Sequence, residues 1–166
     1  RSIIKHGLEV TENPNDYAVR AEIMLEANYA HNGILGVGRE EDWASHAIEH
    51  ELSGIYDIAH GAGLAIVFPA WMKYVYKHDI NRFVRFANKV FAVEISDNKE
   101  QVVFEAIKRL ETFFTKIGLK TRLKDVNIDQ SRFEEMATKA TQFGPIGKFV
   151  KLDKDDIIAI LKLAYA

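Results

Sequence analysis

Cysteine is absent from this 166-residue chain. Its absence excludes disulfides, thiolate zinc sites and cysteine nucleophiles, so any metal ion must be held by nitrogen and oxygen atoms. Neither sign of charge dominates, because 22 Lys and Arg residues nearly offset 24 Asp and Glu residues and leave a net charge of −2. We therefore expect neither a nucleic acid nor a membrane surface to be held by bulk charge.

Long apolar runs are also lacking. The longest, GLAIVFPAWM at residues 63–72, is too short to span a bilayer. The N-terminal stretch RSIIKHGLEVTENPNDY soon meets charge and proline, so it predicts no signal peptide. Together with the missing cysteine, these features favour a cytoplasmic location. The chain starts at Arg1 rather than at a methionine, which indicates a fragment or a processed product.

What the chain does have is helical patterning. Hydrophobic residues make up 48% and charged residues 28%, which is typical of a globular protein with one sizeable core. Apolar residues recur at helical spacing, and no strand pair or internal repeat is evident. Helix N-caps are expected at Asn98 and Asp153, and Ser131 with Glu134 fits a capping box. The sequence predicts an all-α fold of about seven helices that forms a single domain over residues 1–166.

Histidine is concentrated in one place. Three of the six histidines lie in WASHAIEHELSGIYDIAHG, residues 43–61, at His46, His50 and His60. The first two are four apart on a predicted helix, so their imidazoles share one face. The third follows a short loop, just before the glycines that precede an apolar helix, and a return of the chain would bring it near His46. Imidazole nitrogens suit zinc, iron, copper or nickel, so the cluster predicts a metal site. Histidines bonded within a core or on the surface are the alternative.

A shorter pattern overlaps this cluster. His46-Ala-Ile-Glu49-His50 fits the H-x-x-E-H pattern of inverzincin peptidases, in which both histidines bind zinc and the glutamate activates water. Glu94 or Glu105 would then supply a further ligand. Five-residue patterns arise easily by chance, so a peptidase ranks third among the functions considered. Outside that interpretation, we expect Glu49 to be solvated or to form an ion pair between helices.

A much longer match contains the same residues. The stretch HAIEHELSGIYDIAHGAGLAIVFPAWMKYV resembles the iron-dependent (group III) alcohol dehydrogenases, and most of all their butanol dehydrogenase branch. That family's signature has three histidines at this spacing, a glycine after the third and a proline ending an apolar stretch. Here these are His46, His50, His60, Gly61 and Pro69. Later segments, RFVRFANKVFAV, FFTKIGLKTRLKDVNID and IGKFVKLDKDDIIAIL, are similar as well.

The resemblance covers the whole chain but only the C-terminal helical domain of such enzymes. It implies a helical bundle from a two-domain, dehydroquinate synthase-like architecture, with the N-terminal nucleotide-binding domain missing here. The one glycine cluster, GILGVGRE at residues 33–40, follows no β-run and lacks the G-x-G-x-x-G order. It therefore does not replace the missing dinucleotide-binding domain.

The resemblance also implies chemistry. Such enzymes interconvert an alcohol and an aldehyde or ketone by hydride transfer with NAD or NADP, while a divalent metal, Fe²⁺ or Zn²⁺, polarises the substrate oxygen. One aspartate and three histidines hold that metal. His46 and His60 match two of the ligands, and His50 matches a non-ligand histidine beside the metal and the nicotinamide, suited to proton transfer. The other two ligands lie ahead of Arg1, so we expect the isolated chain to bind metal weakly and to be inactive.

Partners follow from the same resemblance, and a second function stays open. The expected partners are a small alcohol or aldehyde, the missing nucleotide-binding domain and, from the apolar helices, another copy of the chain in a homo-oligomer. The competing interpretation is a non-enzymatic helical bundle whose histidines serve packing or an incidental metal. Four aromatic residues could either line a pocket for the alcohol or pack in the hydrophobic core. They are Trp43, Phe68, Trp71 and Tyr74.

Overall fold

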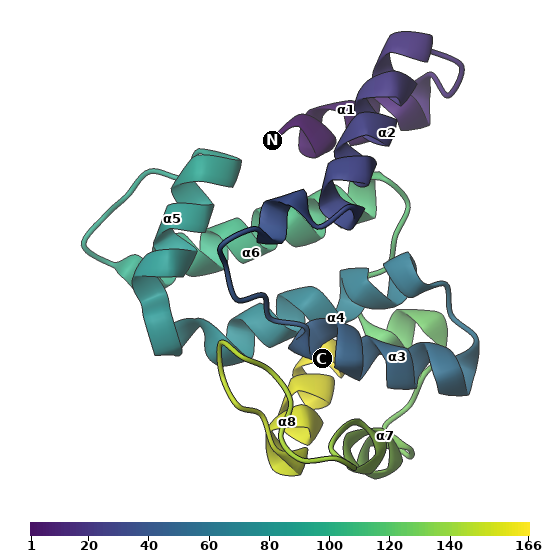
Figure 1. The fold of residues 1–166 in the computed structure, drawn as a ribbon, viewed down its shortest axis with the longest axis vertical. Coiled ribbons are helices and arrows are strands. Elements are labelled where there is room, and N and C mark those ends of the chain that lie inside the picture. Colours follow the sequence, from purple (N-terminus) through teal and green to yellow (C-terminus); the bar gives the residue numbers. More distant parts are fainter. The chain divides into compact units, whose positions relative to one another are not determined.

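The computed structural model describes all 166 residues and contains helices but no strand, as Figure 1 shows. The only β-type pairing is one bridge between Ile146 and Leu152. The all-α prediction is confirmed. Three short 3-10 helices accompany eight α-helices, which are α1 (Ser2–Glu12), α2 (Tyr17–His31), α3 (Ala44–Tyr56), α4 (His60–Val75), α5 (Ile80–Phe91), α6 (Lys99–Lys116), α7 (Phe133–Ala140) and α8 (Lys154–Tyr165).

The chain divides into two compact units, Arg1–Glu41 and Asp42–Ala166. The first unit consists of α1, α2 and a 3-10 helix at Ile34–Gly36, with α1 packed against α2. Helix α1 is the one that the sequence analysis does not predict. It has no side-chain N-cap and no fully buried residue, so no capping signal marks its start.

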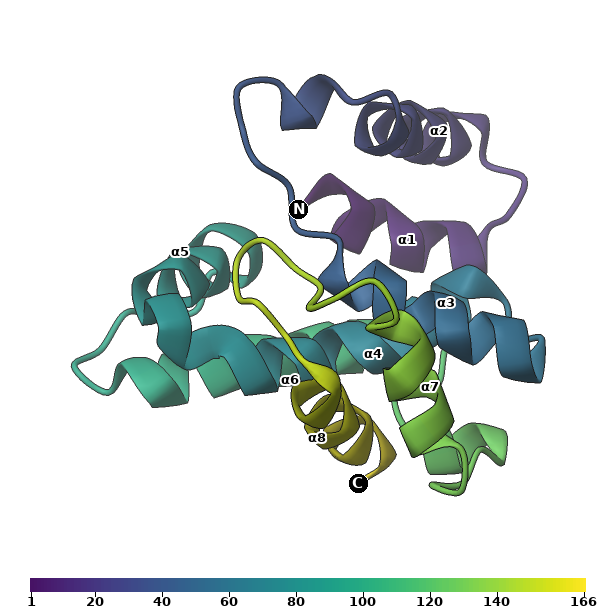
Figure 2. The same ribbon diagram turned by 60° about the horizontal axis from the view of Figure 1, so that its bottom comes forward.

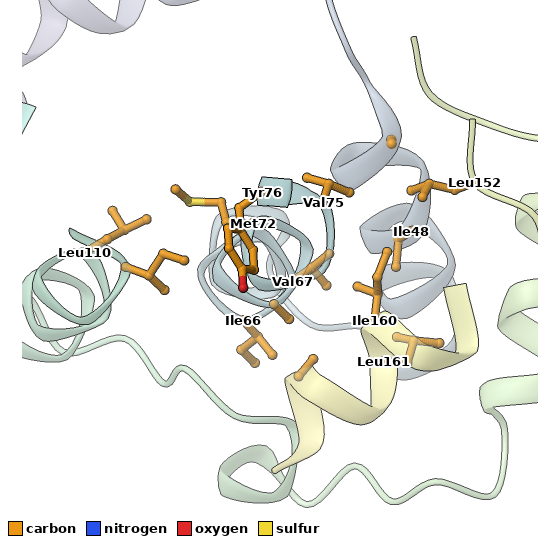
Figure 3. Close-up of a cluster of buried hydrophobic side chains, with 14 of the residues drawn as sticks. Ile48, Ile66, Val67, Met72, Val75, Tyr76, Leu110, Leu152, Ile160 and Leu161 are labelled. Atoms are coloured by element: carbon orange, nitrogen blue, oxygen red, sulfur yellow. The ribbon is translucent and has the colours of Figure 1, made fainter. Parts of the chain in front are cut away.

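Helix α4 occupies the centre of the second unit, where it packs against α3, α6 and α8 (Figure 2). The other helices pack around this group, α7 against α3 and α8, and α5 against α6. Figure 3 shows side chains from four helices meeting around α4, among them Ile48 of α3, Ile66 and Val67 of α4, Leu110 of α6, and Ile160 and Leu161 of α8. Because α4 is covered on several sides, its sequence is apolar nearly all round rather than along one stripe. No helix combines the length and the apolarity needed to cross a membrane.

Helix starts agree only in part with the capping predictions. Asn98 and Asp153 cap α6 and α8 through their side chains, as predicted. The capping box predicted from Ser131 and Glu134 is wrong, because α7 begins two residues after Ser131 and has no side-chain cap. The Ser131 hydroxyl instead donates to Asp129 at 2.5 Å. A carboxylate two residues upstream offers that hydroxyl a local acceptor, which competes with capping.

A charged cluster ties α6 to the central helix. Oε1 of Glu111 on α6 accepts hydrogen bonds from Nζ of Lys73 on α4, at 2.7 Å, and from Nη1 of Arg122, at 2.9 Å. Burial alone would raise the pKa of Glu111. The hydrogen bonds from Arg122 and Lys73 outweigh that effect, so the pKa lies below its ordinary value of 4.5.

We expect Glu111→Gln to lower the free energy of unfolding at pH 7 by about 1–3 kcal/mol, because two charge-assisted hydrogen bonds weaken. Since the pKa of Glu111 is lower in the folded chain than in the unfolded chain, the carboxylate stabilises the fold above pH 4.5. That contribution is lost as the pH falls through the lowered pKa. Urea unfolding across this range should therefore show the two proteins converging in acid.

The control for this experiment is Glu105→Gln, which removes an exposed carboxylate from the same helix. It should change the free energy of unfolding by less than about 0.5 kcal/mol. A difference between wild type and Glu111→Gln that persists unchanged in acid would contradict the role given to Glu111.

Candidate metal centre

A tight connection places the three histidines together. His46 and His50 lie one turn apart on α3, and α4 begins with His60. Between the helices run only the three residues 57–59, and Asp57 turns the chain with a left-handed φ of 52°. Aspartate is one of the few residues that adopt this conformation at modest cost. The short connection returns α4 against α3, so the expected approach of His60 to His46 occurs.

The imidazole rings form a triangle. Ring centroids are 5.4 Å apart for His46 and His60, 5.2 Å for His50 and His60, and 6.4 Å for His46 and His50. The His46 ring is partly buried, and it lies in a T-shaped contact with Trp43, with the ring centroids 4.8 Å apart. His50 and His60 are exposed. The structure thus brings together all three residues that the sequence singles out, and their individual roles stay predictions.

The sequence analysis left two alternatives for Glu49, a solvated position or an ion pair between helices, and the structure decides between them. The side chain of Glu49 is 0% exposed, so a solvated position is ruled out and the interhelix contact holds. Oε1 accepts a hydrogen bond from the Ser53 hydroxyl, and Oε2 contacts Nδ1 of His60. A signal for this burial was available, because Glu49 falls on the stripe of α3 formed by its buried residues, Ala44, Ser45, Ile48 and Leu52.

Two glycines lie inside α4 rather than before it. The helix begins at His60, so Gly61 and Gly63 belong to its first turn. Gly63 is buried, and a Cβ placed there would lie only 2.8 Å from Cδ and Cγ of Glu49. The absence of a side chain at Gly63 therefore makes room for the buried carboxylate.

The donor set fits a divalent metal. One ligand atom each from Glu49, His50 and His60 lies within 4.8 Å of the others, and the His46 ring stands beside this group. Imidazole nitrogens suit Fe²⁺ and Zn²⁺ alike. The geometry gives the peptidase interpretation no support. A glutamate that activates water must reach that water, whereas Glu49 is fully buried and both its oxygens are engaged.

The aromatic residues divide between site and core. Phe68 and Trp71 stack at 5.7 Å, and with Tyr74 they pack against the buried cluster. The Tyr74 hydroxyl donates to Oδ1 of Asp156 at 2.5 Å, and that hydrogen bond, with burial, raises the pKa of Tyr74 to about 12. The core interpretation therefore applies to these three, while Trp43 alone contacts a histidine of the cluster.

The chain belongs to the Fe-containing alcohol dehydrogenase family, whose C-terminal part matches residues 1–165. NADH-dependent butanol dehydrogenase A of Clostridium acetobutylicum is 35% identical over 99% of this chain, which corresponds to 43% of that enzyme. NADPH-dependent aldehyde reductase YqhD of Escherichia coli is 32% identical over 86% of this chain and 37% of its own length.

Solved structures agree with this membership. The crystal structure of NADH-dependent butanol dehydrogenase A from Thermotoga maritima superimposes with a TM-score of 0.94 at 38% identity, over 100% of this chain and 44% of that chain. The family resemblance proposed from the sequence is confirmed, including its restriction to the C-terminal part. The chain spans less than half the length of these relatives.

We expect Gly63→Ala to lower the free energy of unfolding by about 1–3 kcal/mol, because the added methyl group overpacks against Glu49. This loss opposes the gain of up to about 1 kcal/mol that alanine normally brings to a helix interior. Gly54→Ala on α3 is the matched control, since no heavy atom lies within 4 Å of a Cβ placed there. Thermal and urea unfolding of both variants measure the difference. Equal stabilisation by the two substitutions would show that the space at Gly63 is not needed.

Proposed function

We propose that this chain is the metal-carrying helical domain of an NAD(P)-dependent alcohol dehydrogenase, which interconverts an alcohol and an aldehyde or ketone by hydride transfer. The observation that carries the proposal is the cluster of three imidazoles from two helices, His46, His50 and His60. Family membership supports it, because relatives named as butanol dehydrogenases and as an aldehyde reductase match this chain over most of its length.

His46 and His60 are the residues that would hold the metal. When bound, the divalent ion supplies Lewis-acid polarisation of the substrate oxygen. Protein sites of this kind usually carry three or four protein ligands, so two histidines make an incomplete set. We propose that an aspartate and a further histidine from a preceding segment complete it. The exposed faces of His50 and His60 leave the cluster open to such a segment.

His50 is proposed as the proton-transfer residue. Its ring lies 5.2 Å from that of His60, measured between centroids, so it stands beside the proposed ligand pair. The side chain is exposed, which gives a proton leaving the alcohol a direct path to water. Imidazole takes up and releases protons near neutral pH, as this role requires.

The nicotinamide cofactor is proposed to bind mainly outside this chain. Residues 33–40 form a 3-10 helix and turns in which Gly33 and Gly38 have positive φ, and no strand precedes them. This segment therefore lacks the strand-to-helix turn that cradles a dinucleotide pyrophosphate. The proposal includes a small alcohol or aldehyde substrate, a cytoplasmic location and assembly of the whole protein into homo-oligomers.

Metal titrations of the chain test the ligand assignment. We expect His46→Ala and His60→Ala each to weaken Zn²⁺ binding by about tenfold or more, because each removes a ligand. His50→Ala should change the affinity by less than about threefold, since it removes a neighbour rather than a ligand. Isothermal titration calorimetry measures all three.

A His6→Ala variant controls for a second group, His6, Glu22 and Glu26, whose ligand atoms also lie within 4.8 Å of one another. Equal affinity in wild type, His46→Ala and His60→Ala would rule out the assignment. If His50→Ala weakens Zn²⁺ binding and His46→Ala does not, the ligands are Glu49, His50 and His60 instead.

Activity tests the function itself. Mass spectrometry of the natural gene product should show a polypeptide that extends upstream of Arg1 by a glycine-rich α/β half. We expect that product to oxidise butan-1-ol with NAD⁺ or NADP⁺, and the 166-residue chain alone to show no turnover. His50→Ala in the longer protein should lower kcat by about 10²–10⁴-fold. A natural start at Arg1 with no dehydrogenase activity would favour a non-enzymatic bundle.

A further inference from the structure

Glu49 is the only charged residue in the buried core of the chain, and only Ser45 joins it among buried polar residues. Taking a carboxylate out of water costs several kcal/mol unless its oxygens are paired. Both oxygens of Glu49 are paired, Oε1 with the Ser53 hydroxyl and Oε2 with Nδ1 of His60. The space for this group exists because position 63 is a glycine. Ser53, His60 and Gly63 thus together accommodate one buried carboxylate.

The pairing fixes how His60 presents its ring. Oε2 of Glu49 lies in hydrogen-bond contact with Nδ1 of His60, and a carboxylate oxygen accepts when Nδ1 carries the proton. The opposite nitrogen, Nε2, is then the one with a free lone pair. The His60 side chain is 47% exposed whereas Glu49 is fully enclosed, so the ring is anchored on its buried side and accessible on the other.

We propose that Glu49 is a positioning residue, which holds His60 in the Nδ1–H tautomer so that Nε2 is directed to the metal. This inference rests on the proposed function, because it needs His60 to be a ligand. Metal-binding histidines commonly donate their second N–H to a carboxylate, and removal of that carboxylate typically weakens metal binding about 10–100-fold. Direct ligation by Glu49 is the competing role, and its complete burial and two occupied oxygens argue against it.

The first measurement needs no metal. Long-range ¹H–¹⁵N spectra of the 166-residue chain report which ring nitrogen of each histidine carries the proton. We expect the Nδ1–H tautomer for His60 in wild type and a mixture of tautomers in Glu49→Met, which keeps the apolar volume but removes the acceptor. Glu49→Gln should retain much of the Nδ1–H form, because an amide oxygen still accepts a hydrogen bond. Glu51→Gln, on the same helix, is the matched control and should leave the His60 signals unchanged.

The second measurement is Zn²⁺ affinity, followed through the histidine ring signals of the same proteins. We expect about 10–100-fold weaker binding in Glu49→Met, a smaller loss in Glu49→Gln and none in Glu51→Gln. In a His60→Ala background, Glu49→Met should cause no further loss, because Glu49 acts only through His60. Additional weakening in that background would show direct ligation by Glu49 and overturn the proposal.

The two measurements separate the possible failures. If His60→Ala leaves Zn²⁺ affinity unchanged, the proposed function fails, whatever the tautomer spectra show. If His60→Ala weakens binding but Glu49→Met and Glu49→Gln alter neither tautomer nor affinity, the positioning role of Glu49 fails alone. If Glu49→Met does not fold, Glu49→Gln still tests the role through affinity, because a neutral amide oxygen is a weaker acceptor than a carboxylate. Unchanged Zn²⁺ affinity in Glu49→Gln would then overturn the proposal.

Discussion

The burial of one helix supports both the fold and the candidate metal centre. Helix α4 packs against α3, α6 and α8, and its apolar side chains supply much of the core. The same helix begins with His60, so the position of that imidazole is set by the packing of α4 rather than by a mobile loop. Burial of apolar surface is the dominant stabilising term in a domain of this size. A side chain at the end of such a helix is held by the whole core.

The sequence indicated the fold and the histidine cluster because both depend on local periodicity. A spacing of four places His46 and His50 on one helical face, and a short connection limits where His60 can go. The resemblance to the family added the roles that are proposed for the three histidines. Helix α1 escaped prediction because it has no side-chain cap to mark its start, and none of its residues is fully buried.

The surroundings of Glu49 could not be read with the same certainty. Its charge indicates exposure, whereas its place on the buried stripe of α3 indicates the core. The packing of α4 against α3 decides between exposure and burial. His60, whose Nδ1 contacts the carboxylate, and Gly63, which leaves space for it, both belong to α4 rather than to the helix of Glu49. The capping box expected at Ser131 failed for a different reason, since Asp129, only two residues upstream, accepts from the same hydroxyl. Sequence patterns locate a residue on its own element, and the partner that stabilises it often comes from elsewhere.

The connection between α3 and α4 limits how the chain can vary. It has three residues, and its turn depends on one left-handed aspartate, Asp57. Each residue of an α-helix turns the next by about 100°, so a single insertion or deletion here would rotate or displace the start of α4 relative to α3. His60 would then leave the other two imidazoles, and the buried carboxylate of Glu49 would lose its partner. Loops usually tolerate changes of length. The length of this connection, in contrast, sets the position of His60 relative to His46 and His50, so we expect it to be as restricted as the histidines themselves.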